Sequence, residues 1–287
     1  DPKSDRVVVV DLDDDSLKEI GQWPWPRYQV AELTRRILDA GASVVGYDVI
    51  FSEPDRTSPT VMTNAILQQF GVEVEFRGLP EEYQDYDSLF AGQLGRGRTI
   101  LGCFMRPVDE KPEHVDTSAD SHFKPVIFPR AKRTSEDVLP RYLLQADGLT
   151  VSIPQLRQAT QSAFLNAVVE PDGIIRYGPL VWQFGDRFYP SLALMALCLD
   201  QDIPRCVLEY DANGVVAVHA GRFDMPADQA GRLAINYRTI RENEKTGLVS
   251  SFPVLSAADV LKGRVGAQEL TNKVVFVGTS AVGLKDL

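Results

Sequence analysis

The sequence is short of cysteine and histidine, from which zinc sites and disulfide frameworks are usually built. Its 287 residues include three cysteines and three histidines. Three cysteines are few and odd in number, so they specify no disulfide framework. The histidines form neither an HxH nor an HExxH spacing, which argues against a zinc site. There is also no GxSxG string and no Ser/His/Asp arrangement, so nothing in the sequence indicates nucleophilic catalysis.

The sequence also lacks long apolar runs and clusters of positive charge. No apolar run approaches the roughly 20 residues that span a bilayer. The formal net charge is −10, and the 30 Lys and Arg residues are scattered. Nucleic acid and anionic lipid are therefore poor partners. With 44% hydrophobic residues the chain can still bury a sizeable core, and its length fits one large domain or two.

The best-defined stretch of the sequence, residues 6–55, predicts one βαβ unit. Residues 6–13 form a β-branched run that ends in acids, which is typical of a strand buried on both faces of a parallel sheet. Asp13 and the acids after it predict caps for a short helix, and Pro26 predicts the first turn of a longer one that Gly41 ends. We expect the second strand at residues 44–51.

Acids gather where both of these strands end. Asp11 and Asp13 end the first strand, Asp48 lies in the second, and Glu53 follows it, with Asp55 just beyond. A right-handed crossover puts the carboxyl ends of both strands on one edge of the sheet, where α/β proteins bind ligands. A last strand at residues 273–278 is suited to pair beside the first, which would place the loop after Gly278 next to Asp11 and Asp48.

These positions provide the candidate ligand-binding residues, for which several interpretations stay open. Several carboxylates near one point need a cation or a basic neighbour, so they suggest Ca²⁺ or Mg²⁺, or a partner such as Arg27 or Lys285. The alternatives are helix caps and turn acceptors, or a metal-dependent hydrolase. Any metal ligands would be Asp11, Asp13, Asp48 and Glu53. The full candidate set is Asp11, Asp13, Trp25, Arg27, Asp48, Glu53, Lys285 and Asp286.

Two motifs near these residues have a structural interpretation as well as a functional one. The Trp-Pro-Trp-Pro segment that contains Trp25 is either an aromatic ligand wall or a helix entry with tryptophans packed over the core. The loop 278–283 resembles a phosphate cradle. Asp286 however stands where Ser or Thr would hold magnesium, and an acid there would repel a phosphate.

The rest of the chain predicts an α/β fold with a mostly parallel central sheet, flanking helices and an antiparallel β-hairpin extension. Residues 57–69 and 83–94 predict helices, the first with an apolar stripe along one side, and residues 99–105 predict a buried strand that contains Cys103. Residues 106–148 form an irregular excursion with several prolines. Turns at 171–173 and 211–214 predict hairpins, and residues 192–199 predict a buried helix. Cys198 and Cys206 flank the end of that helix and could in principle be bridged in an oxidising compartment.

Several unusual strings carry a family resemblance. They are Asp13-Asp14-Asp15-Ser16-Leu17, the doubled Trp-Pro of residues 21–27, the segment 47–54, Asp172-Gly-Ile-Ile-Arg176 with Pro190-Ser-Leu-Ala193, and the closing segment 278–286. In this order they resemble the second CHASE family, the extracellular sensory domains of bacterial receptors. The resemblance covers essentially the whole chain.

The resemblance implies one sensory domain over residues 1–287. Its parts would be a βαβ part at 1–105, the excursion at 106–148, and β-hairpins with the closing strand at 149–287. It implies a periplasmic or extracellular location between flanking transmembrane helices, a homodimer, and no enzyme activity of this segment itself. The signal would pass to a cytoplasmic output such as an adenylate or other nucleotide cyclase, a histidine kinase, a Ser/Thr kinase or a diguanylate cyclase. The resemblance names no small-molecule or protein stimulus.

Overall fold

In the computed structural model the chain forms two compact units. The first consists of Asp1–Thr99, Ser152–Thr160 and Phe252–Leu287, and the second of Ile100–Val151 and Gln161–Ser251. The residues that the structure describes are 6–108, 126–132, 138–237, 241–242, 249–250 and 252–281. None of the helices within these ranges is long and apolar enough to cross a membrane.

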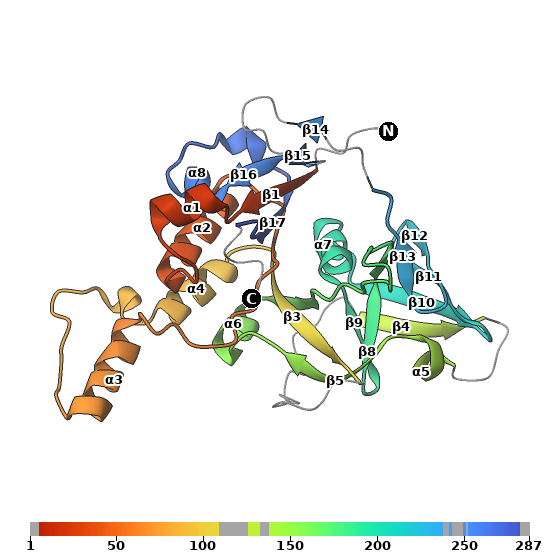
Figure 1. Cartoon of the computed structure of the whole chain (residues 1–287), viewed down its shortest axis with the longest axis horizontal. Helices are drawn as coiled ribbons and strands as arrows, with labels where there is room; N and C mark the ends of the chain where they lie inside the picture. The colour runs from red at the N-terminus through yellow and green to blue at the C-terminus, as the bar shows by residue number, and fades with distance from the viewer. Residues whose placement is uncertain are drawn as a thin grey trace. The chain divides into compact units, whose positions relative to one another are not determined.

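The first unit is built on parallel strands (Figure 1). Their order is β16 (Val254–Ser256), β1 (Val7–Asp11), β17 (Val274–Gly278) and β2 (Val44–Tyr47). All three pairings are parallel, and the closing strand lies directly beside the first, as the sequence predicts. The valines of β2 and β17 are buried, and so are Val8 and Val10 of β1, whereas Val7 and Val9 on the opposite face of β1 are partly exposed.

Helices complete the first unit. They are α1 (Asp14–Ile20), α2 (Arg27–Asp39), α3 (Pro59–Phe70), α4 (Tyr86–Leu94), α6 (Pro154–Ala159) and α8 (Ala257–Leu261), with single turns η1 (Glu81–Tyr83) and η2 (Ala267–Glu269). The helix α2 buries Val30, Leu33 and Ile37 at helical spacing and packs against α4 and α8. The helix α4 packs in turn against α6.

The helix α3 contributes little to the core of this unit. Pro59 is its one buried residue, and Phe70 at its end is 67% exposed. Figure 1 shows α3 running away from α1, α2 and α4 of the same unit. The apolar stripe that the sequence indicates in this helix therefore forms, but it does not meet the core.

The second unit contains a mixed sheet around β3 (Thr99–Pro107). This strand pairs parallel with β6 (Gln161–Phe164) and antiparallel with β5 (Gln145–Thr150), and β5 leads to β8 (Val181–Phe184) and β9 (Arg187–Pro190). Its core includes Cys103, Met105, Phe164 and Trp182. Cys103 is thus a small buried residue of the core, as expected.

A second core in this unit joins helices to an antiparallel hairpin. The strands β12 (Phe223–Pro226), β11 (Gly214–Ala220), β10 (Arg205–Asp211) and β4 (Val126–Ala131) form one sheet. Together with α7 (Leu192–Asp200) and α5 (Leu139–Tyr142) they bury Leu194, Leu208 and Val218. Two small ribbons pair β7 (Tyr177–Pro179) with β13 (Arg232–Ala234), and β14 (Arg241–Glu242) with β15 (Val249–Ser250).

The predicted fold class is confirmed: an α/β fold with a large, mostly parallel sheet, flanking helices and antiparallel strands. The described parts of residues 106–148 contain β4, α5 and β5. The division of the chain into one sensory domain with three parts stays a prediction.

Two local predictions are wrong. The strand expected at 44–51 ends at Tyr47, because the chain then leaves the sheet. Phe51 N donates to Ser152 Oγ, and Phe51 O accepts from Ile153 N. The hairpin expected around 171–173 forms its turn, with Gly173 at φ 80°, but residues 166–170 are not a strand. The second arm pairs elsewhere, since β7 bonds to β13.

Candidate functional site

The carboxyl edge of the parallel sheet brings Asp11 beside the loop that follows β17. In the sheet register Asp11 stands opposite Gly278 on one side and Ser256 on the other. Leu12 N donates a hydrogen bond to Gly278 O at 2.8 Å, and Thr279 Oγ1 donates to Leu12 O at 3.0 Å. The backbone on both sides of Asp11 is therefore held against this loop.

Asp11 itself binds Ser280. The Ser280 amide donates to Asp11 Oδ1 at 2.8 Å, and the Ser280 hydroxyl donates to Asp11 Oδ2. Asp11 is only 5% exposed, and its burial raises the pKa of the carboxyl group. The two hydrogen bonds from Ser280 lower that pKa in part, while the charges of Asp13 and Asp14 raise it. We call this arrangement the Asp11–Ser280 clamp.

Asp13 has a structural role next to the clamp. It is the N-cap of α1, and its Oδ1 accepts from Ser16 N at 2.8 Å and from Ser256 Oγ at 2.9 Å. The buried Ser16 hydroxyl accepts in turn from Ala258 N at 3.0 Å. Asp13 thus ties the start of α1 to the start of α8, which is the capping interpretation of this acid.

Asp48 lies close to the same loop but stays open to solvent. Its backbone amide donates to Val277 O at 2.8 Å, so it is the residue at which β2 leaves β17. A Cβ added at Gly278 would lie 3.5 Å from Asp48 Cβ. Partial desolvation raises the pKa of the Asp48 carboxyl, whose side chain still reaches the surface. Gly278, from which the loop starts, therefore lies against Asp48, and the loop itself is held by Asp11.

Arg27 belongs to a different, buried cluster. Its amide donates to Asp55 Oδ2 at 2.6 Å, its Nη2 donates to Glu53 O at 3.2 Å, and its Nε lies 3.6 Å from Asp87 Oδ1. The guanidinium carbon is 4.5 Å from the centre of the Phe51 ring. Burial lowers the pKa of Arg27, and the carboxylates of Asp87 and Asp55 partly oppose this.

Asp55 and Asp87 hold the chain at residues 55–57, just before α3, by hydrogen bonds. Asp55 Oδ1 accepts from the amide and the hydroxyl of Thr57 at 2.8 and 2.7 Å. Asp55 N donates to Asp87 Oδ2 at 2.8 Å, and burial raises the pKa of Asp87. Sequence reasoning missed Asp87, because it lies in a helix distant along the chain and no local pattern marks it.

The remaining candidates do not join these groups. The Glu53 side chain points to solvent and pairs with Arg56 at 2.5 Å. Trp25 is 2% exposed, donates from Nε1 to Gly21 O at 2.7 Å, and meets Trp23 edge-on, which is the core interpretation. Lys285 and Asp286 lie outside the described residues.

The acids of the described ranges do not form a metal-ligand set. Within those ranges no three His, Cys, Asp or Glu side chains are grouped so as to hold a metal ion. Asp11, Asp13 and Asp55 accept hydrogen bonds from protein groups instead. In this arrangement the carboxylates cap a helix, fix a loop and brace an arginine.

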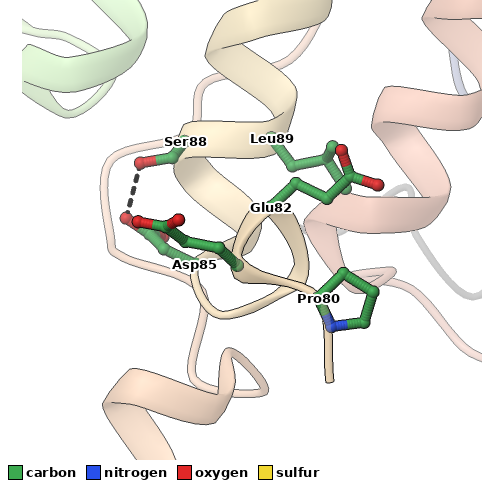
Figure 2. Close-up of a pocket in the computed structure, with 6 residues that line it drawn as sticks. Pro80, Glu82, Asp85, Ser88 and Leu89 are labelled. Carbon is green, nitrogen blue, oxygen red and sulfur yellow. Dashed lines mark hydrogen bonds between the residues drawn. The ribbon is translucent and has the colours of Figure 1, made fainter. Parts of the chain in front are cut away.

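A further acidic surface lies between η1 and α4. Pro80, Glu81, Glu82, Asp85, Ser88 and Leu89 line a hollow of approximately 730 Å³. Figure 2 shows Asp85 and Ser88 facing one another there, with the Ser88 hydroxyl donating to Asp85 Oδ2 at 2.8 Å. Gln155 of α6 also donates to Asp85, so the protein itself satisfies part of this carboxylate.

Comparison with known families decides what kind of domain this is. The family model of the CHASE2 domain matches residues 1–287. The chain belongs to the CHASE2 family. Searches of curated proteins and of solved structures found no match. CHASE2 domains are extracellular sensory domains of signalling receptors and are not catalytic, which agrees with the resemblance carried by the sequence strings.

The strings that carried the resemblance to the CHASE2 family contribute to the clamp and to its surroundings. Ser280 of the clamp belongs to the closing string, and Asp13 and Ser16, next to the clamp, belong to the acidic string near the start. The sequence alone does not show which contacts these strings make. In this CHASE2 domain they meet at one edge of the sheet, where they fix α1, α8 and the loop after β17 to one another.

Proposed function

We propose that this CHASE2 domain is the periplasmic sensor of a bacterial transmembrane receptor. It binds a stimulus or a partner and relays the event to a cytoplasmic cyclase or kinase output. The family match over the whole chain supports this proposal. The domain itself carries no catalytic step, because the receptor's output domain would perform the chemistry.

The Asp11–Ser280 clamp is the structural observation that supports a route for the relay. The chain enters the sheet at Val7 and leaves it at Gly278, on two strands that pair directly. Because these strands are parallel, the chain enters the sheet at the amino ends of the strands and leaves it at their carboxyl ends. The clamp sets where Thr279 and Ser280 lie relative to β1. A stimulus that opens or closes it changes that position, and the flanking transmembrane helices would carry the change inward.

The test is the output of the full-length receptor in membranes. Asp11→Asn and Ser280→Ala each remove part of the clamp, and Ser52→Ala is the control at an exposed serine outside the clamp and the hollow. We expect both clamp variants to change basal cyclase or kinase output at least two-fold at equal receptor amounts, while Ser52→Ala leaves it unchanged. Wild-type output from both clamp variants would contradict the proposed route.

A further inference from the structure

Two cysteines of the second unit lie in contact inside its hydrophobic core. Cys198 Sγ and Cys206 Sγ are 3.4 Å apart. Both residues are buried, with 1% and 0% exposure, in the cluster that also contains Leu194 and Leu208. Since a free thiol is a small apolar group, packing alone accounts for the burial of each cysteine. It does not require that two of them face one another.

The backbone fixes both positions. Cys198 lies near the end of α7, where its carbonyl accepts from Ile203 N at 2.8 Å and so turns the chain back. Cys206 lies inside β10, paired with Ala220 of β11 on one side and with Ile127 of β4 on the other. The contact between the two sulfurs therefore joins the end of a helix to a central strand of the sheet.

We propose that Cys198 and Cys206 form an intrachain disulfide in the extracellular compartment where CHASE2 domains reside. Such compartments are oxidising, and disulfides form and persist there. Bond formation needs the sulfurs to approach from 3.4 Å to roughly 2.05 Å.

The chemistry is a thiol–disulfide exchange with a protein disulfide donor as the oxidant. One cysteine thiolate attacks a sulfur of the donor's disulfide, which gives a mixed disulfide and releases one donor thiolate. The second cysteine thiolate then attacks the mixed disulfide and releases the other. Cys198 and Cys206 together lose two protons and two electrons, and the donor is reduced to its dithiol.

Cys103 provides an internal control in the same unit. It is fully buried in β3 and belongs to a different core cluster, with Met105 and Trp182. Burial raises the pKa of the Cys103 thiol, so it is a poor thiolate for exchange. The proposal therefore expects one pair of bonded cysteines and one thiol.

The test counts thiols in the full chain after export to the periplasm. The protein is unfolded in guanidinium with iodoacetamide and without reductant, so that burial cannot protect a thiol, and its intact mass is measured. We expect one alkylated cysteine without reductant and three after reduction, with peptides of Cys198 and Cys206 linked. Three alkylated cysteines without reductant would overturn the proposal, whatever the receptor's output.

A thermal melt gives a second readout. Closing the short loop 198–206 restricts the unfolded chain, so reduction should lower the melting temperature of the wild type by roughly 5 °C. The double variant Cys198→Ala and Cys206→Ala should not respond to reductant, and Cys103→Ala should respond as the wild type does. A wild type whose melting temperature is insensitive to reductant would count against a stabilising disulfide.

Discussion

Two buried charged side chains, Asp11 and Arg27, show how single residues join distant segments of this domain. Asp11 binds Ser280, and Arg27 contacts Asp55 and Asp87. In both cases burial disfavours the charged form, and hydrogen bonds or opposite charges offset that cost. Removing either side chain should therefore change stability by more than a surface charge would.

Asp11 should make the stability of the domain depend on pH. Its folded-state pKa is raised above the ordinary value of 3.8, so the folded state holds this proton more tightly than the unfolded state. The contribution of Asp11 to the free energy of unfolding is then complete below pH 3.8 and declines as the pH rises through the folded-state pKa. We expect Asp11→Asn to lack this decline.

The measurement is the free energy of urea unfolding of the wild type and Asp11→Asn from pH 4 to pH 7. Their difference should shift in favour of the Asn variant as the pH rises. Taking the difference removes the contributions of Asp48 and Asp87, whose raised pKa values act in both proteins. A difference that stays constant over this range would show that Asp11 titrates in the folded state as it does in the unfolded one.

Arg27 should contribute far more to the free energy of unfolding than a neighbouring surface arginine does. Arg27→Ala leaves Asp87 buried without its cation and removes the bond to the Glu53 carbonyl, so we expect a loss of about 3 kcal/mol in unfolding free energy. The control is Arg56→Ala, which breaks an exposed ion pair with Glu53 and should cost less than about 1 kcal/mol. Urea unfolding of both variants measures the contrast, and equal losses would refute it.

At the scale of the residue, the sequence predicted where some side chains lie better than it predicted which partners they bind. It placed Asp11 and Asp48 beside the loop after Gly278, because strand ends and a right-handed crossover follow from local patterns. It did not predict that Arg27 and Asp55 turn away into a separate cluster with Asp87. That grouping depends on α4 packing against α2, which no local pattern encodes.

At the scale of the element, the β10–β11 hairpin depends on one glycine. Gly214 has φ 110° at the hairpin turn, and a Cβ there would lie 2.6 Å from Gln229 O. Only glycine adopts this conformation without strain, and the space beside it is occupied by backbone. The hairpin and the Gln229 segment are therefore packed together at a distance that a methyl group would disturb.

Gly214→Ala should consequently destabilise the domain by more than about 2 kcal/mol, since backbone strain adds to a steric overlap. Gly185→Ala is the matched control in the β8–β9 hairpin, with φ 60° and nothing within 4 Å of its added Cβ. That variant should carry the backbone strain alone, about 1 kcal/mol. Thermal or urea unfolding separates the two, and a Gly185→Ala loss as large as that of Gly214→Ala would contradict the argument.

The elements that the sequence predicted well are those with strong local signals. The buried strands β1 and β17, the helix α2 and the β10–β11 hairpin all have clear periodicity or turn residues. The failures come from tertiary pairing. The strand after Gly173 pairs with β13 rather than with its neighbour in sequence, and the stripe of α3 finds no core to cover.

At the scale of the whole molecule, the compact units are not continuous in sequence. Residues 152–160 and 252–287 return to the first unit after segments that belong to the second. The hydrogen bond from Ile153 N to Phe51 O, at 2.8 Å, is one contact made by such a return. Contacts of this kind join residues far apart in the chain, so periodicity and turn signals do not predict them.

The oligomeric state of the domain is the prediction that belongs to this scale. A receptor that relays a stimulus by shifting one subunit against another needs a homodimer, and we expect the domain to dimerise reversibly. Each subunit has a net charge of −10, so two copies repel one another. Raising the ionic strength from about 0.05 to 0.5 M shortens the Debye length and should strengthen the dimer several-fold. Sedimentation velocity at 1–100 µM measures both the reversible dimerisation and its dependence on salt. A mass of 31.8 kDa at every concentration and salt would contradict dimerisation by this domain.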